Sequence, residues 1–223
     1  MKNFIFDLYN TLIEVRTDEH CEETWTPVAE YFAAHGIKTD WRRLMDEFDR
    51  YWKLFNERAL AEHKFLFPEC DCVTQFESIA RSVGGKLTRA QAEEALKLMR
   101  KKSTRVLKPF DGAKELLIEL RSKGANTYLL SNAQAAFTRD EIKACGLWGA
   151  FDGMLLSSEH GCRKPDPAFF GILFDTYGLE KNESVMIGDD KSSDIAGAER
   201  FGIASVWAPG GAAAHRDEIV ALL

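Results

Sequence analysis

Residue types that bind cations and phosphate follow four short apolar runs of this chain. Asp7 follows residues 4–6, and Ser131 and Asn132 follow residues 127–130. Lys164 comes a few residues after the run 154–156, and Asp189, Asp190 and Asp194 come after the run 185–187. If these runs are parallel strands, their carboxyl ends meet at one edge of a sheet. We therefore expect polar groups that are far apart in the sequence to form a single site.

The charges of this set point to a bound cation. Four aspartates and one lysine leave three surplus negative charges. Like charges in a partly desolvated site are costly, and a divalent cation removes much of that cost. A ligand set made only of oxygen atoms fits Mg²⁺. A Mg²⁺ site beside a hydroxyl, an amide and an ammonium is suited to phosphate.

The elements that must position these residues are short strands separated by helical patterns. Besides the four runs, residues 204–207 form a fifth short run that reads as a buried parallel strand. Helical patterns lie between the runs, at residues 112–123, 136–145, 167–177 and 194–201. Alternation of strand and helix predicts an α/β fold with a doubly wound, parallel, Rossmann-like sheet.

A helical block interrupts this core soon after its first strand. Four amphipathic helices are expected at residues 22–35, 41–62, 72–82 and 88–103. The expected domains are a core of residues 1–15 and 105–223 and an inserted α-helical cap of residues 16–104. A cap inserted at a strand end is expected to roof the site and exclude water from it.

Composition excludes several other functions. A net charge of −6 argues against a nucleic-acid binder, which needs a basic surface. The sequence contains no apolar stretch near the length of about 18 residues that marks a membrane helix. Five cysteines without a regular framework and a start unlike a secretory signal peptide indicate a cytoplasmic protein with reduced thiols.

The four motifs together resemble those of the haloacid dehalogenase-like hydrolase superfamily, which carries a small helical cap after its first motif. The resemblance implies that Asp7 is a nucleophile that becomes an aspartyl-phosphate. It implies phosphate binding by Ser131, Asn132 and Lys164, and Mg²⁺ binding by Asp7, the main-chain carbonyl of Tyr9 and Asp189. The residues that it places around the metal without direct binding are Thr11, Asp190 and Asp194.

Tyr9 departs from the pattern of the family's phosphatases. Those enzymes usually carry a second Asp two residues after the nucleophile, where it protonates the leaving oxygen. Tyr at this position resembles the 2-haloacid dehalogenase branch, which cleaves a carbon–halogen bond without metal. That branch has neutral groups at the fourth motif, whereas this chain has Gly188-Asp189-Asp190.

The acidic fourth motif favours a Mg²⁺-dependent phosphatase of a small phosphorylated metabolite. The Tyr9 hydroxyl would then replace the missing acid only in part, since the pKa of tyrosine lies near 10. Two alternatives stay open: a 2-haloacid dehalogenase, and a non-catalytic binding module on the same fold.

Overall fold

Two units make up the chain. The computed structural model describes residues 2–62 and 64–223. One unit, here called the core unit, comprises Met1–Val15 and Leu107–Leu223, and the other, here called the helical unit, comprises Arg16–Val106. The chain leaves and re-enters the core unit through β2 (Ile13–Thr17) and β3 (Thr104–Pro109), which pair as a two-stranded sheet.

A parallel five-stranded sheet forms the centre of the core unit. Its strands, in spatial order, are β5 (Gly153–Leu156), β4 (Asn126–Ser131), β1 (Asn3–Phe6), β6 (Ser184–Gly188) and β7 (Ala204–Trp207). The residues of β1 and β6 are buried throughout, which explains why both read as continuous apolar runs in the sequence. The α/β fold class and the five expected strands are confirmed.

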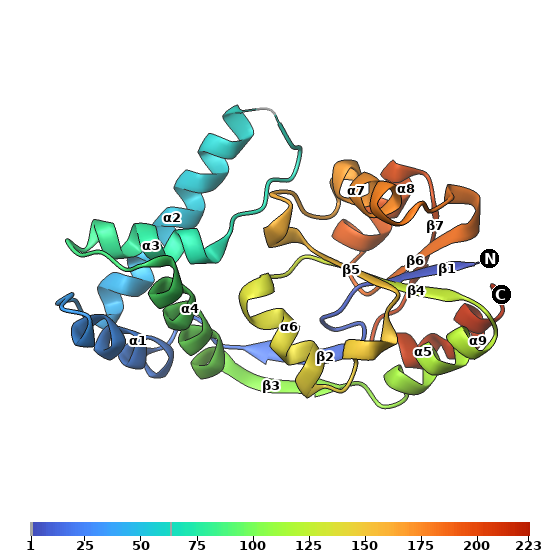
Figure 1. Cartoon of the computed structure of the whole chain (residues 1–223), viewed down its shortest axis with the longest axis horizontal. Helices are drawn as coiled ribbons and strands as arrows, with labels where there is room; N and C mark the ends of the chain where they lie inside the picture. The colour runs from blue at the N-terminus through green and yellow to red at the C-terminus, as the bar shows by residue number, and fades with distance from the viewer. Residues whose placement is uncertain (1, 63) are drawn as a thin grey trace. The chain divides into compact units, whose positions relative to one another are not determined.

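Helices cover both faces of this sheet (Figure 1). On one face lie α5 (Ala113–Ser122) and α6 (Ala135–Ala144), and on the other lie α7 (Pro167–Tyr177) and α8 (Ala196–Phe201). The short α9 (Arg216–Val220) buries Ile219 in the same apolar cluster as α5. This double winding follows from right-handed crossovers that run first in one direction, from β1 to β4 and β5, and then in the other, from β5 to β6 and β7.

The strand order places the carboxyl end of β1 where the winding reverses. Strands β4 and β5 lie to one side of β1, and β6 and β7 lie to the other. The crossovers therefore diverge at this point and leave a crevice beyond the strand ends. Asp7, the first residue after β1, lies at this crevice.

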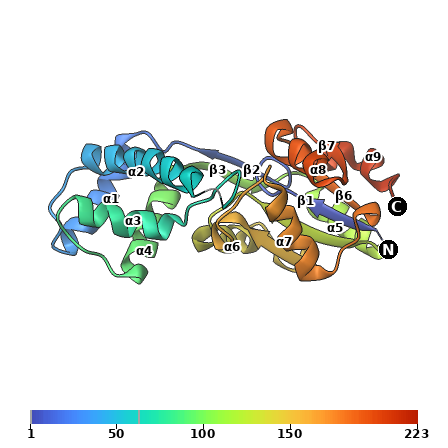
Figure 2. The ribbon, with the colours of Figure 1, turned by 90° about the horizontal axis from the view of Figure 1, so that it is seen from above.

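The helical unit contains α1 (Glu22–Ala34), α2 (Trp41–Ala61), α3 (Cys72–Ser82) and α4 (Arg89–Ser103), which pack on one another (Figure 2). The four expected helices are thus confirmed. Their shared core is aromatic: the ring of Trp25 stacks on Phe76 at a centroid distance of 6.2 Å and meets Phe48 edge-on at 5.3 Å. In the described part of the chain, no helix combines the length and the apolar character needed to span a membrane.

Two local expectations differ from the structure. The strands β2 and β3 were not anticipated, because β2 is largely half-exposed and lacks the continuous apolar pattern of the buried strands. A regular helix expected to begin at residue 194 begins instead with a π-helical turn, Lys191–Ile195, followed by α8. Asp190 caps this turn, and Asp194 lies inside it.

Candidate active site

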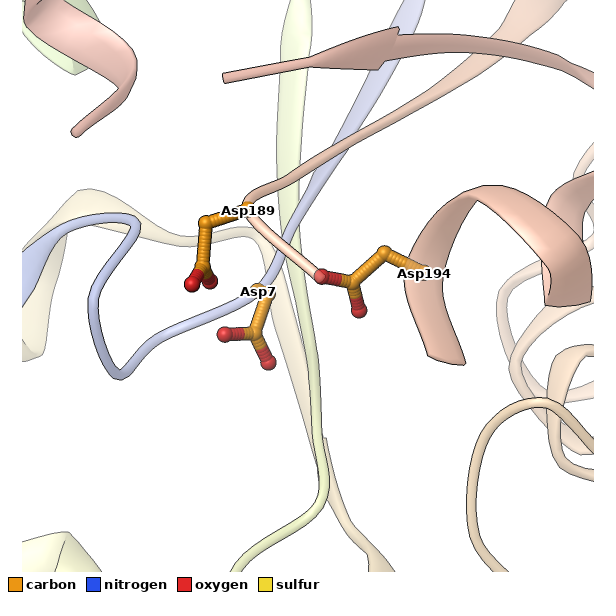
Figure 3. Close-up of side chains that lie close together, drawn as sticks. All are labelled: Asp7, Asp189 and Asp194. Atoms are coloured by element: carbon orange, nitrogen blue, oxygen red, sulfur yellow. The ribbon is translucent and has the colours of Figure 1, made fainter. Parts of the chain in front are cut away.

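The carboxylates of Asp7, Asp189 and Asp194 gather at the carboxyl ends of the central strands (Figure 3). Asp7 follows β1, Asp189 follows the neighbouring strand β6, and Asp194 belongs to the π-helical turn. One oxygen atom from each of the three carboxylates lies within 4.8 Å of the other two. That separation is small enough for one hard cation to contact all three.

A glycine lets Asp194 come this close to β6. A Cβ atom at Gly188 would lie only 2.1 Å from Asp194 Oδ2, so any side chain there would displace the carboxylate. The same Oδ2 accepts a hydrogen bond of 3.1 Å from the backbone N–H of Asp190. The end of the strand and the turn that follows it thus hold Asp194 in place.

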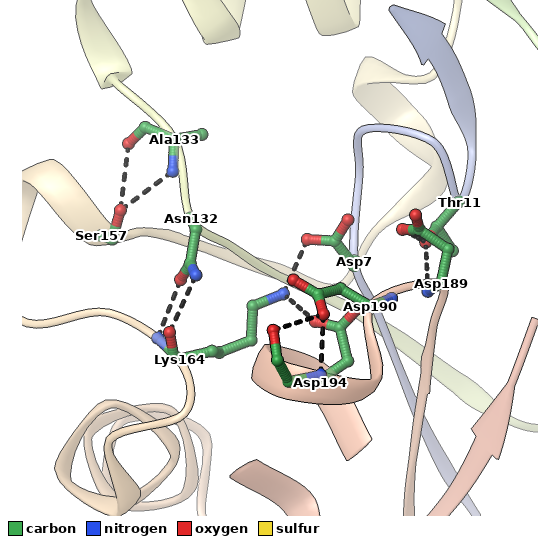
Figure 4. A network of polar contacts seen from close by, with 10 residues as sticks. Asp7, Thr11, Asn132, Ala133, Ser157, Lys164, Asp189, Asp190 and Asp194 are labelled. Carbon is green, nitrogen blue, oxygen red and sulfur yellow. Dashed lines mark hydrogen bonds and ion pairs between the residues drawn. The ribbon is translucent and has the colours of Figure 1, made fainter. Parts of the chain in front are cut away.

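Lys164 connects two of the three carboxylates (Figure 4). Its Nζ lies 2.6 Å from Asp7 Oδ1 and 2.6 Å from Asp194 Oδ1, and its side chain is only 1% exposed. Burial lowers the pKa of Lys164, but the charges of Asp194 and Asp7 outweigh burial and raise it. The lysine is therefore a buried permanent cation.

One ammonium does not neutralise this cluster. Burial raises the pKa of Asp7 to about 7; Asp194 and Asp189 add to the rise, and Lys164 opposes it. Burial is also the main reason that the pKa of Asp189 is raised. Three carboxylates with one lysine leave two surplus negative charges, so the donor set fits a divalent cation.

Asp190 has a different role from its neighbour. Its Oδ1 accepts hydrogen bonds from the backbone N–H and the hydroxyl of Ser192, both at 2.7 Å. Burial raises the pKa of Asp190, but the hydrogen bonds from Ser192 and Ser193 outweigh burial and lower it. Asp190 is thus an ionised cap of the π-helical turn that carries Asp194.

Two residues outside the acidic motif orient Asp189. Thr11 Oγ1 is 2.9 Å from Asp189 Oδ1 and 3.1 Å from its backbone nitrogen. Trp207 Nε1 donates to the main-chain carbonyl of Asp189 at 2.8 Å. The sequence analysis did not predict Trp207 as a site residue. Trp207 ends an expected strand, so its position at a strand end could have indicated it.

Ser131 and Asn132 lie on the opposite side of Asp7 from Asp189. Ser131 ends β4 and is 1% exposed, and its Oγ has no hydrogen-bond partner among the described residues. The side chain of Asn132 donates to the carbonyl of Lys164 at 2.9 Å and accepts from its N–H at 2.8 Å. Asn132 therefore holds the lysine loop, while the Ser131 hydroxyl is left for a ligand.

These residues line a half-open cavity of about 200 Å³ in the core unit. Its lining residues are Asp7, Tyr9, Asn10, Ser131, Asn132, Lys164, Asp189, Asp190, Ser193 and Asp194. Every residue expected in the site lines this cavity except Thr11, which instead donates a hydrogen bond to the Asp189 carboxylate.

The loop after β1 contains Asn10 and Tyr9. Asn10 adopts φ 61°, a left-handed conformation that Asn tolerates and that the tight turn after β1 requires. The hydroxyl of Tyr9 bonds to Thr138 and Glu141 on α6, two residues that the sequence did not single out.

Comparison with known proteins agrees with this geometry. A sequence model of haloacid dehalogenase-like hydrolases matches residues 1–202. The chain is 34% identical over 149 residues to mouse N-acylneuraminate-9-phosphatase, covering 63% of this chain and 59% of that protein. It is 24% identical over 217 residues to glyceraldehyde 3-phosphate phosphatase of Pyrococcus furiosus, covering 97% and 84%.

A solved structure has the same fold. The 2-haloacid dehalogenase of Pseudomonas syringae pv. Tomato superposes with a TM-score of 0.61 at 20% identity, over 93% of this chain and 86% of that one. At this identity the likeness concerns the fold alone. The chain spans about three fifths of the length of the mouse relative.

Proposed function

Because this chain belongs to the haloacid dehalogenase-like hydrolases, we propose that it hydrolyses a small phosphorylated molecule with Asp7 as the nucleophile and Mg²⁺ as the cofactor. The observation that carries this proposal is the surplus of negative charge around Asp7, with three carboxylates and one buried lysine at one cavity. Such a cavity repels an anionic substrate unless a cation offsets its charge.

The residues present fit Mg²⁺. Asp7 and Asp189 would bind it through carboxylate oxygens, together with the main-chain carbonyl of Tyr9. Asp194 and Asp190 would support these ligands from the turn after β6, and Thr11 orients Asp189. When bound, Mg²⁺ offsets the negative charge of the carboxylates and the phosphate and polarises the phosphoryl group.

The chain's own groups then have distinct tasks. A carboxylate oxygen of Asp7 forms a bond to phosphorus while the bond to the leaving oxygen breaks, which gives an aspartyl-phosphate. Lys164 and the Ser131 hydroxyl stabilise charge on the phosphoryl oxygens. Water then cleaves the aspartyl-phosphate and regenerates Asp7.

The relatives support the class of substrate. The names of the two phosphatases aligned above refer to small phosphorylated molecules, a sugar acid and a three-carbon sugar. The 200 Å³ cavity accommodates a phosphate group with part of a small molecule. We therefore propose a small phosphorylated metabolite as substrate.

One observation favours a second candidate, a 2-haloacid dehalogenase: Tyr9 lines the cavity beside Asp7. A dehalogenase needs no metal, however, and the carboxylates of Asp189 and Asp194 would repel a haloacid anion. The acidic cluster therefore weighs for the phosphatase.

One experiment separates the candidates. Phosphate release from p-nitrophenyl phosphate is measured with Mg²⁺ and with EDTA, and chloride release from 2-chloropropionate is measured with EDTA. We expect phosphate release that requires Mg²⁺ and is lost in Asp7→Asn. Chloride release in EDTA would instead support the dehalogenase, and neither activity, with no Mg²⁺-dependent rise in Tm, would support a binding module.

A further inference from the structure

Tyr9 lines the cavity beside Asp7, but its hydroxyl group is bound to α6. The hydroxyl donates to Glu141 Oε2 and lies 2.9 Å from Thr138 Oγ1. A phenol has a single hydrogen, so Thr138 must be the donor in the second bond. The hydrogen of Tyr9 is therefore committed to Glu141.

Both partners on α6 are buried, which strengthens this attachment. Thr138 is 0% exposed and Glu141 is 8% exposed. Hydrogen bonds to a carboxylate are stronger than bonds between neutral groups, and more so away from water. Turning the Tyr9 hydroxyl toward the substrate would remove this donor from a buried carboxylate, which is unfavourable.

Other groups near Asp7 are engaged elsewhere or are poor acids. Lys164 donates two of its three ammonium hydrogens to Asp7 and Asp194, and in the proposed function the third stabilises a phosphoryl oxygen. The Asn132 amide donates to the carbonyl of Lys164. The Asp190 carboxylate is an acceptor. Carboxylates that bind a metal must be deprotonated. A serine hydroxyl such as that of Ser131 is not among the usual general acids.

From this arrangement we infer that Glu141 and Thr138 are positioning residues that withhold the Tyr9 proton, so that the core unit gives no proton to the leaving oxygen. The substrate class is therefore phosphates whose leaving group is stable as an anion, acyl or aryl phosphates, in contrast to the alkyl phosphates to which the names of the two phosphatase relatives refer. The inference rests on the proposed function and names the substrate class of the same site.

The bond changes balance without an acid. Asp7 bonds to phosphorus, the bond to the leaving oxygen breaks, and the electron pair departs with a carboxylate or phenolate. The aspartyl-phosphate is itself an acyl phosphate, so its hydrolysis again expels a carboxylate, that of Asp7. The proton of the attacking water goes to a phosphate oxygen and leaves with inorganic phosphate.

The test measures kcat/KM with Mg²⁺ for acetyl phosphate, p-nitrophenyl phosphate, phenyl phosphate and glycerol 2-phosphate. We expect the value to fall steeply as the leaving group becomes more basic. Between the nitrophenyl and glycerol esters the fall should exceed about 10²-fold, the lower end of what a general acid contributes.

Variants of two residues test whether the missing proton donor causes the dependence of kcat/KM on leaving-group basicity. Tyr9→Asp supplies an acid in the same loop, so it should raise the rate on glycerol 2-phosphate and make this dependence less steep. Glu141→Leu removes the carboxylate that accepts the Tyr9 proton, leaving only Thr138 as a partner, and should partly flatten the dependence on leaving-group basicity. Glu141→Gln keeps an acceptor and should restore the steep wild-type dependence. A structural defect alone would lower all rates together and leave the dependence unchanged.

The outcomes separate this inference from the proposed function. A shallow dependence in the wild-type protein overturns the inference and leaves the phosphatase in place, because some group then protonates the leaving oxygen. A dependence that stays steep in Glu141→Leu overturns the role of Glu141. No phosphate release from any of the four compounds overturns the proposed function and the inference with it.

Discussion

Thr11 and Asp189 are joined by two hydrogen bonds that share one hydroxyl group. Thr11 Oγ1 donates to Asp189 Oδ1 at 2.9 Å and accepts the backbone N–H of Asp189 at 3.1 Å. Thr11 is fully buried in the loop after β1, and Asp189 follows β6. One side chain therefore sets the position of Asp189 relative to the strand that carries Asp7.

Removing this hydroxyl should weaken both the fold and the cation site. We expect Thr11→Val to lower the free energy of unfolding by about 1–3 kcal/mol, because a part-buried N–H loses its acceptor. We also expect weaker Mg²⁺ binding in calorimetric titration. Thr11→Ser keeps the hydroxyl and serves as the control. Equal Mg²⁺ affinity in the two variants would show that the hydroxyl does not orient Asp189.

Ser131 should matter for the ligand and not for stability. Its buried hydroxyl has no partner among the described residues and so adds no hydrogen bond to the fold; Ser131→Ala should therefore not lower the free energy of unfolding. Loss of a hydrogen bond to a charged phosphate should lower kcat/KM about tenfold to a hundredfold. As the control, Ser157→Ala removes a buried hydroxyl that accepts from the N–H of Ala133, and it should destabilise the fold. Unchanged kinetics in Ser131→Ala would place the phosphate elsewhere.

Lys164 should be essential to the fold in the absence of metal. Lys164→Met leaves the carboxylates of Asp7 and Asp194 buried without their cation, and it should lower the free energy of unfolding by about 3–5 kcal/mol. Adding Asp194→Asn to this variant removes one of the two charges and should recover part of the loss. Urea denaturation of both single variants and the double variant gives the coupling. If the free energy lost in the double variant equals the sum of the losses in the two single variants, the ion pair between Lys164 and Asp194 is contradicted.

The metal-free protein should lose stability as the pH rises toward neutral. The folded-state pKa of Asp7 is raised from 3.8 to about 7 by burial, so between these values the native state holds a proton that the unfolded chain has released. Wild-type stability relative to Asp7→Asn should therefore fall between about pH 4 and pH 7, by at most about 1.4 kcal/mol per pH unit. Urea denaturation in EDTA measures this difference. A constant difference would mean that the pKa of Asp7 is not raised.

Much of the core could be predicted because its local signals agree with its environment. Strands such as β1 and β6 are buried on both faces, so each forms an uninterrupted apolar run. In the sequence, Asp166 followed by Pro167 is typical of a helix start, and the Asp166 side chain accepts the N–H of Ala168 at the start of α7. The strands β2 and β3 carry no such signal, because their pairing joins segments separated by the whole helical unit.

The site likewise contains residues that could be predicted from the sequence and residues that could not. Asp7, Ser131 and Asp189 were predictable because the end of a parallel strand determines where they lie. The bonds of the Tyr9 hydroxyl were not predictable, because they depend on the direction of a side chain and on the rotation of α6. Thr138 and Glu141 are polar residues on a helix, and the pattern alone assigns such residues to the solvent face.

The strand order has a consequence for a chain that emerges from the ribosome in sequence. Strand β1 is made first and pairs with β4 on one side, but its other neighbour, β6, begins only at Ser184. Until then one edge of β1 lacks its partner and is open to pairing with another chain. The pairing of β6 with β1 covers this edge and also places Asp189 beside Asp7, so the same strand pairing protects the edge and assembles the acidic cluster.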